Sequence, residues 1–223
     1  MRFEVDAILF DIDGTLVDST AAVERIWRAW ADSHGLDVRQ ILEVCHGRRS
    51  QDTVALFLPD EPDGQQSAAV TELERLELDD LADVVALPGA RDLLSSLAME
   101  RWAAVTSGSR ALMRARLGAA GLPIPRVLVA AEDVMQGKPD PEGYRAAAAA
   151  LGMNIRRCLV IEDAPAGIAA GRAACAPVLA VATSHDASAL GTADAVVPDL
   201  TACRVERTAD GLTLTIPGDG SIP

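Results

Sequence analysis

Two carboxylates one residue apart follow the first apolar run of the sequence. Residues 7–10 read Ala-Ile-Leu-Phe, and Asp11, Ile12 and Asp13 come directly after them, before a Gly-Thr turn. A short apolar run bounded by a turn is typical of a buried strand, and in an extended chain Asp11 and Asp13 share one face. Ligands of open α/β sheets bind beyond the carboxyl ends of strands, so this position favours chemistry over packing. Two like charges held close favour a bound cation, although a solvated turn after an edge strand would use the same residue types.

A single lysine is the second candidate. Of the 20 lysines and arginines in the chain, only Lys138 is a lysine, and it lies in the segment Gln-Gly-Lys-Pro-Asp-Pro-Glu at 136–142. A compact ammonium fits between a carboxylate and a phosphate where a broad guanidinium would not. We therefore expect Lys138 to lie at the same site, with chance retention of one lysine as the alternative.

Two further apolar runs end in residues that bind cations or phosphate. Residues 158–161 lead into Glu162 and Asp163. The Asp163 carboxylate would complete a Mg²⁺ site with Asp11 and the backbone carbonyl of Asp13, and Glu162 would contribute through a water. Residues 103–105 lead into Thr106 and Ser107. The Thr106 hydroxyl and the Ser107 backbone N–H would bind a phosphate oxygen beside a helix N-terminus, although the same residues also make an ordinary turn and helix cap.

In this order, the four segments resemble the motifs of the haloacid dehalogenase-like hydrolases, over almost the whole chain. The matching residues are 11–15, Thr106-Ser107, Lys138 and Glu162-Asp163. Segments 105–109, 136–139 and 162–171 are most similar to the branch of glycerol-3-phosphatases and 2-deoxyglucose-6-phosphatases.

The resemblance implies a phosphatase that acts on a small phosphorylated metabolite. Asp11 would attack phosphorus and form an aspartyl phosphate, which splits one difficult displacement into two. Asp13 would protonate the leaving alcohol and then take a proton from the hydrolytic water. Mg²⁺ would offset the negative charges while Lys138 and Thr106 hold the transferring group in line.

The expected fold is a doubly wound parallel α/β sheet of the Rossmann-like kind with an inserted helical cap. Runs near 102–106, 126–130, 158–162, 178–182 and 194–197 alternate with helical patterns, which is typical of such a sheet. Residues 18–86 carry helical apolar spacing without strand-like runs. We therefore expect residues 1–17 and 87–223 to form the catalytic core and 18–86 the cap. A small hairpin over 204–216, turning at 209–211, would precede a loose Pro/Gly end.

The cap would choose the substrate by closing over the nucleophile and excluding water. In the resembled phosphatases a His-Gly-x-Arg stretch occurs where this chain has His46 to Arg49. Arg49 would contact phosphate or a sugar hydroxyl and His46 would donate to a hydroxyl. The alternative is that Arg48 and Arg49 are solvated and His46 caps a helix. Trp27 and Trp30 coincide with the apolar stripe of one helix, which favours packing.

The expected site residues fall into three groups. They are catalytic Asp11, Asp13, Thr106 and Lys138; phosphate- or substrate-binding Ile12, His46, Arg49, Thr106, Ser107 and Lys138; and metal-binding Asp11, Asp13, Glu162 and Asp163.

Composition excludes several other classes. A net charge of −13 without basic runs argues against a nucleic-acid surface. No apolar run reaches membrane-spanning length and the first residues do not form a signal segment, so we expect a cytoplasmic protein. The four cysteines form no Cys-x-x-Cys pair, which favours reduced thiols. The oligomeric state has no signal in the sequence.

Three rival functions share these motifs. Related β-phosphoglucomutases carry a cap histidine where this chain has Val23, and the cap has no lysine for a second phosphate, which counts against a mutase. A haloacid dehalogenase would not need Asp13 together with Glu162 and Asp163. A protein that only binds phosphorylated metabolites would not need every catalytic position.

Overall fold

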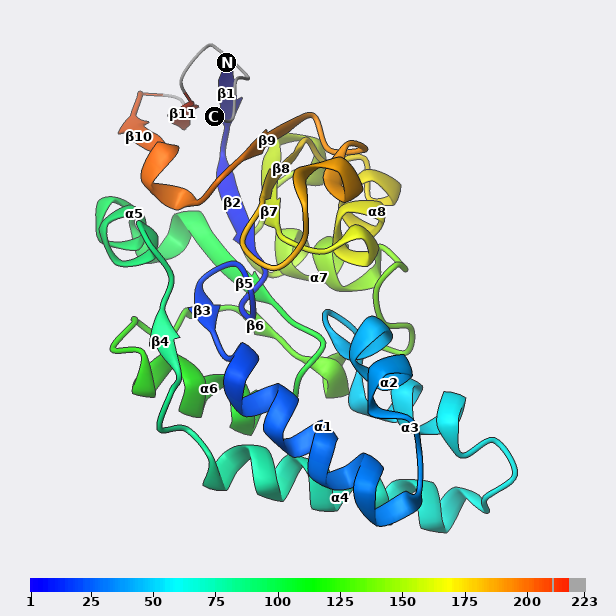
Figure 1. Ribbon diagram of the computed structural model, residues 1–223. Coiled ribbons are helices and arrows are strands. Elements are labelled where there is room, and N and C mark those ends of the chain that lie inside the picture. The colour runs from blue at the N-terminus through cyan, green and yellow to red at the C-terminus, as the bar shows by residue number, and fades with distance from the viewer. Residues whose placement is uncertain (210, 217–223) are drawn as a thin grey trace.

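A six-stranded parallel sheet forms the centre of the computed structural model, which describes residues 1–209 and 211–216 (Figure 1). Its strands, in spatial order, are β6 (Leu128–Val129), β5 (Trp102–Val105), β2 (Ala7–Phe10), β7 (Cys158–Glu162), β8 (Val178–Val181) and β9 (Ala195–Val197). All five neighbouring pairs are parallel. The predicted doubly wound α/β sheet is therefore confirmed.

The strand order reverses between β2 and β7. After β2 the chain adds β5 and β6 on one side, and it then crosses back to add β7, β8 and β9 on the other. Chain connections leave in opposite directions at such a point, so a crevice opens beyond the carboxyl ends of the two strands. Asp11 follows β2 and Asp163 follows β7, so both lie at this crevice.

Helices cover both faces of the sheet, and the central strands are consequently apolar on both sides. On one face, α5 (Ala90–Ser96) and α6 (Arg110–Ala119) pack over a core that includes Phe10 and Trp102, whose rings meet edge to face at 6.0 Å. On the other face, α7 (Glu142–Ala150) and α8 (Pro165–Ala173) pack over a second core. Burial from both sides explains why β2 and β7 read as continuous apolar runs.

A separate layer of four helices lies beyond the carboxyl ends of the strands (Figure 1). These helices are α1 (Thr20–His34), α2 (Val38–Cys45), α3 (Ser50–Phe57) and α4 (Asp63–Asp79). They share a core of their own, in which Trp27 and Trp30 are buried with their rings 5.3 Å apart. The packing interpretation of these two tryptophans is confirmed.

Two short strands connect this helical layer to the sheet. The chain leaves through β3 (Val17–Asp18) and returns through β4 (Val85–Ala86), and these two strands pair in antiparallel fashion. Neither strand is predictable from the sequence, because a run of two residues has no recognisable period. The pairing holds the outgoing and returning segments side by side.

A three-stranded antiparallel sheet brings the two ends of the described chain together. It consists of β1 (Arg2–Val5), β11 (Leu212–Thr215) and β10 (Arg204–Arg207) in that order. The predicted hairpin corresponds to β10 and β11, while β1 was not anticipated. Residue 210 of the predicted turn and the predicted loose end at 217–223 lie outside the described residues.

Short 3₁₀ turns complete the described secondary structure. They cover Met99–Arg101, Ala131–Asp133, Ile155–Arg157, Ala187–Leu190 and Leu200–Ala202. Within residues 1–209 and 211–216, no helix has the length and apolar character needed to cross a membrane.

Candidate active site

Lys138 lies at the centre of the crevice and joins the ends of β2 and β7. Its Nζ pairs with Asp11 Oδ1, lies 2.6 Å from Glu162 Oε1 and donates to the Val105 carbonyl at 3.3 Å. Burial would lower the pKa of Lys138, but the charges of Asp11 and Glu162 outweigh burial and raise that pKa above its ordinary value. The lysine is therefore a fixed positive charge beside Asp11.

Glu162 holds this lysine in place. Its Oε1 also accepts from the Tyr144 hydroxyl at 2.8 Å, and its Oε2 accepts from the backbone N–H groups of Asp163 at 3.0 Å and Ala164 at 3.2 Å. The Lys138 Nζ lies 5.4 Å from the centre of the Tyr144 ring. Since both oxygens of Glu162 already accept hydrogen bonds, this residue is an anchor for Lys138.

Asp163 is buried with two hydroxyl donors. Thr15 Oγ1 donates to Asp163 Oδ1 at 3.1 Å, and Ser184 Oγ donates to Oδ2. Burial, followed by the charge of Glu162, raises the pKa of Asp163 to about 7. Gly14 approaches it closely: φ is +83°, and a Cβ atom there would overlap the Asp163 carboxylate. Only glycine satisfies both conditions at this turn.

Three carboxylates in this crevice have the composition of a divalent-metal site. Oxygens of Asp11, Glu162 and Asp163 lie within 4.8 Å of one another and all three residues are buried. Burial raises the pKa of Asp11 well above its ordinary range, despite the opposing charge of Lys138. Three buried acids facing one lysine leave negative charge uncompensated, and hard oxygen donors of this kind suit Mg²⁺. The residues present therefore fit the expected ion, with Asp11 and Asp163 as its side-chain ligands.

Asp13 lies on the same side of the turn but faces different partners. Ser19 Oγ donates to its Oδ1 at 2.8 Å, and Arg116 Nη1 donates to its Oδ2 at 2.8 Å. Among the residues that the structure describes, none donates to the Asp13 backbone carbonyl, so this carbonyl is available to a metal ion. The side chain itself is oriented by Ser19 and Arg116 and borders the cavity.

Thr106 and Ser107 line the cavity that contains Asp11, and Ile12 follows Asp11 directly in the chain. Thr106 is buried and Ser107 Oγ donates to the Gly47 carbonyl of the helical layer at 2.9 Å. The Ile12 side chain is fully buried in the core, so the backbone is the part of this residue that remains for a ligand. Within the described residues, the backbone N–H groups of Ile12 and Ser107 have no acceptor, which leaves them free for phosphate oxygens.

The structure separates His46 from Arg49, which the sequence analysis had grouped. His46 lines the same cavity as Asp11, and burial lowers its pKa. Arg49 instead pairs with Asp52 through contacts of 2.8 and 3.0 Å and packs against Gly137. Arg48 lines the cavity in its place.

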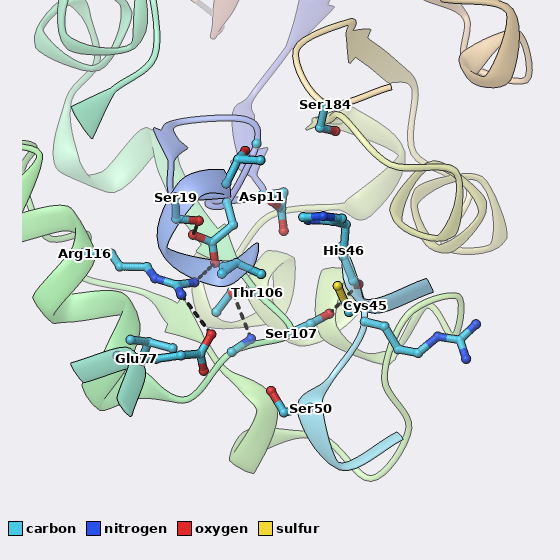
Figure 2. A pocket seen from close by; sticks show the side chains of 18 of the residues that line it. Asp11, Ser19, Cys45, His46, Ser50, Glu77, Thr106, Ser107, Arg116 and Ser184 are labelled. Carbon is cyan, nitrogen blue, oxygen red and sulfur yellow. Dashed lines mark hydrogen bonds and ion pairs between the residues drawn. The ribbon is translucent and has the colours of Figure 1, made fainter. Parts of the chain in front are cut away.

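The cavity has a volume of about 80 Å³ and lies between the sheet and the helical layer (Figure 2). That volume is several times what one ordered water needs. Figure 2 shows Asp11 and Thr106 between Arg116 and Glu77 on one side and His46 on the other.

Two lining residues, Arg116 and Glu77, are not among those predicted from the sequence. Arg116 lies on α6 and Glu77 on α4, and Arg116 Nη2 donates to Glu77 Oε1 at 2.9 Å. A signal existed, because each falls on the buried stripe of its helix, four residues after Leu112 and Leu73 respectively. A charged residue at a stripe position indicates a buried partner.

Comparisons with known proteins agree with this geometry. A profile described as haloacid dehalogenase-like hydrolase matches residues 5–174. Hexitol phosphatase A of Escherichia coli (strain K12) is 43% identical over 205 residues, covering 91% of this chain and 95% of that protein. The 2-deoxyglucose-6-phosphate phosphatase 2 of Saccharomyces cerevisiae is 36% identical over 240 residues, covering 96% of each. A solved hydrolase from Pseudomonas syringae superposes with a TM-score of 0.75 at 28% identity, covering 87% of this chain and 94% of that one.

Proposed function

The chain belongs to the haloacid dehalogenase-like hydrolases, and we propose that it hydrolyses a small sugar or polyol phosphate with Mg²⁺ through an aspartyl-phosphate intermediate. The resemblance drawn from the four sequence motifs is confirmed, and the protein is a phosphatase of this family. Its relatives named for hexitol and 2-deoxyglucose-6-phosphate support the substrate class.

The observation that carries the proposal is the buried arrangement of Asp11, Lys138 and Asp163 at the strand-order reversal. Asp11 attacks phosphorus with the oxygen that Lys138 does not hold, and the P–O bond to the alcohol breaks. Lys138, Thr106 and the free N–H groups of Ile12 and Ser107 bind the phosphate oxygens. Mg²⁺, when bound by Asp11, Asp163 and the Asp13 carbonyl, supplies positive charge that reduces repulsion between an anionic nucleophile and an anionic ester.

Asp13 is the proposed acid and base. It gives a proton to the leaving alcohol oxygen, and in the second step it takes one from the water that attacks the aspartyl phosphate. Its contacts with Ser19 and Arg116 fix the carboxylate at the edge of the cavity, next to where the alcohol departs.

Residues 18–86 are proposed to act as the cap over a core formed by 1–17 and 87–223. The supporting observation is that β3 and β4 pair where the chain leaves and re-enters the core. Gly47 reaches Ser107 across the cavity, and His46 lies over Asp11, so the helical layer borders the substrate. We propose that His46 donates to a substrate hydroxyl, and that Arg49 serves the site only indirectly, by packing against the loop of Lys138.

The test is phosphate release from sugar, polyol, nucleotide and 2-phosphoglycolate monoesters, with Mg²⁺ and with a chelator. Metal-dependent release concentrated on sugar or polyol phosphates is expected, together with its loss in Asp11→Asn. Asp32→Asn, an exposed change on α1, is the matched control and retains activity. Isomerised sugar phosphate without phosphate release would contradict the proposal and favour a mutase.

A further inference from the structure

Glu77 is a buried carboxylate of the helical layer that the reaction steps above do not use. It lies on α4, is 6% exposed and lines the cavity that contains Asp11 and Asp13. Arg116 Nη2 donates to its Oε1 at 2.9 Å, and no residue within the described ranges donates to its Oε2. This oxygen is not among the fully buried unpaired atoms of the described residues, so it is open to a donor in the cavity, and a ligand that displaces water there without supplying a donor leaves a charged acceptor unsatisfied.

Arg116 fixes Glu77 relative to the proposed acid and base. The Arg116 side chain is 4% exposed, and its second terminal nitrogen donates to Asp13 Oδ2 at 2.8 Å. One planar guanidinium therefore places the Asp13 and Glu77 carboxylates side by side along one wall of the cavity, as Figure 2 shows for Arg116 and Glu77. Two carboxylates share this single cation, so the wall retains net negative charge.

We propose that Glu77 accepts a hydrogen bond from a free hydroxyl of the leaving alcohol, and that Arg116 is the residue that positions it. This inference rests on the proposed function, because Asp13 identifies the leaving oxygen. The alcohol oxygen must lie against Asp13, so the neighbouring carbons of the alcohol extend along the same wall towards Glu77. A hydroxyl on one of those carbons supplies the proton that Oε2 lacks.

The chemistry of this wall defines the class of substrate. A neutral, hydroxyl-bearing alcohol satisfies Glu77 Oε2, whereas an alkyl chain buries it without a donor. A second phosphate at the same place would meet a carboxylate and be rejected. The subsite therefore selects monophosphates of polyols and sugars over alkyl phosphates and bisphosphates.

The experiment compares two pairs of esters matched in carbon number, with and without hydroxyls. They are glycerol 3-phosphate with n-propyl phosphate, and sorbitol 6-phosphate with n-hexyl phosphate, assayed for kcat/KM with Mg²⁺. In Glu77→Gln the acceptor stays in place but loses its charge. We expect the preference for the hydroxylated ester to fall about tenfold, because hydrogen bonds to charged acceptors are stronger, whereas any loss shared by both esters through Arg116 and Asp13 cancels in this ratio. Glu74→Gln, one turn away on α4 and outside this cavity, retains the wild-type preference.

The possible results distinguish a failure of the Glu77 inference from a failure of the proposed function. Equal losses on both members of a pair would overturn the inference and make Glu77 a structural residue, and an unchanged preference would overturn it as well. Absence of phosphate release by the wild-type protein from the whole ester panel, with Mg²⁺ present, would instead contradict the proposed function.

Discussion

At the level of single residues, the site holds buried carboxylates close together, and their mutual repulsion costs stability. Asp11, Glu162 and Asp163 are all buried, and Lys138 is their shared positive partner. Burial without full compensation raises the pKa values of Asp11 and Asp163. Active sites commonly sacrifice stability in this way for a catalytic arrangement.

Asp11→Asn tests this trade-off directly. The change preserves the shape of the side chain but removes the nucleophile and one repelling charge. We expect phosphate release to fall by about 10⁴-fold or more, and the melting temperature in chelator to stay equal or rise. Phosphate assays and thermal unfolding of the same preparation measure both effects.

The melting temperature of Asp11→Asn in chelator tests whether removing one buried negative charge offsets the loss of the Asp11–Lys138 pair. A melting temperature in chelator well below that of the wild-type protein would show that the Asp11–Lys138 pair stabilises the fold more than the repulsion costs. The Asp32→Asn control must match the wild-type protein in both assays.

At the level of secondary-structure elements, one ion-paired residue bridges the helical layer and the core. Arg116 on α6 contacts Glu77 on α4 and Asp13 in the turn after β2. Its Nε is buried without a hydrogen-bond partner among the described residues. The two ion pairs of Arg116 hold its guanidinium in place, so the folded protein tolerates the unpaired Nε.

Arg116→Met is expected to destabilise the protein by about 3–5 kcal/mol, because it leaves two carboxylates buried without their cation. Urea unfolding monitored by circular dichroism measures the change. Arg114→Met, on the exposed side of the same helix, should stay within about 0.5 kcal/mol of the wild-type protein. Equal effects of the two substitutions would refute the bridging role.

Helix α8 packs against the anchor of Lys138 through a glycine. A Cβ atom at Gly167 would overlap the Glu162 carboxylate. We expect Gly167→Ala to cost about 1–3 kcal/mol despite the higher helix propensity of alanine, and to lower kcat at least tenfold by displacing Glu162 from Lys138.

Gly118→Ala is the matched control on α6. A Cβ atom at Gly118 meets nothing within 4 Å, so propensity alone should act and stabilise the protein by about 0.5–1 kcal/mol. Chemical unfolding and steady-state kinetics on both variants test the contrast. Stabilisation by both substitutions would show that Glu162 moves aside freely.

At the level of the whole molecule, stability should depend on pH and metal together. The pKa of Asp163 is about 7 in the folded protein, above its ordinary value of 3.8. The folded state therefore binds this proton more tightly than the unfolded state. The resulting stabilisation is complete below about pH 4 and is lost as pH rises through 7.

We accordingly expect the melting temperature in chelator to fall between pH 6 and pH 8, by about 5 °C. With Mg²⁺ the decline should shrink or reverse, because the metal binds the ionised carboxylates. Asp163→Asn should reduce the decline in chelator, and the part that remains belongs to Asp11, whose pKa burial also raises. A melting temperature that rises over this range in chelator, for the wild-type protein, would contradict the argument.

The strands and site residues that form a recognisable pattern of consecutive residues could be predicted from the sequence. β2, β7 and the residues that follow them were predictable, because strands buried on both faces read as apolar runs and their ends carry the acids. Thr106 and Lys138 were predictable from their residue types and short motifs. β1, β3 and β4 were not, since each is two to four residues long and exists through a partner far along the chain.

The cap end of the cavity was less predictable for a related reason. Arg116 and Glu77 are 39 positions apart, and each lies among other charged residues on its own helix. Arg49 was expected beside the substrate; in the structure it pairs with Asp52, three residues away, and lines a second, neighbouring pocket rather than the cavity of Asp11. Which of several arginines turns inward depends on tertiary packing.

The pairing of β1 with β11 has a consequence for biosynthesis. The partner of β1, β11, begins only at Leu212, so at ordinary translation rates β1 is synthesised roughly 10–40 s before its partner strand. The parallel sheet and the catalytic crevice can be assembled during that interval, whereas the small sheet closes only after β11 has been synthesised. Ribosome-bound intermediates of this enzyme would therefore present an open strand edge to chaperones until the last described strand emerges.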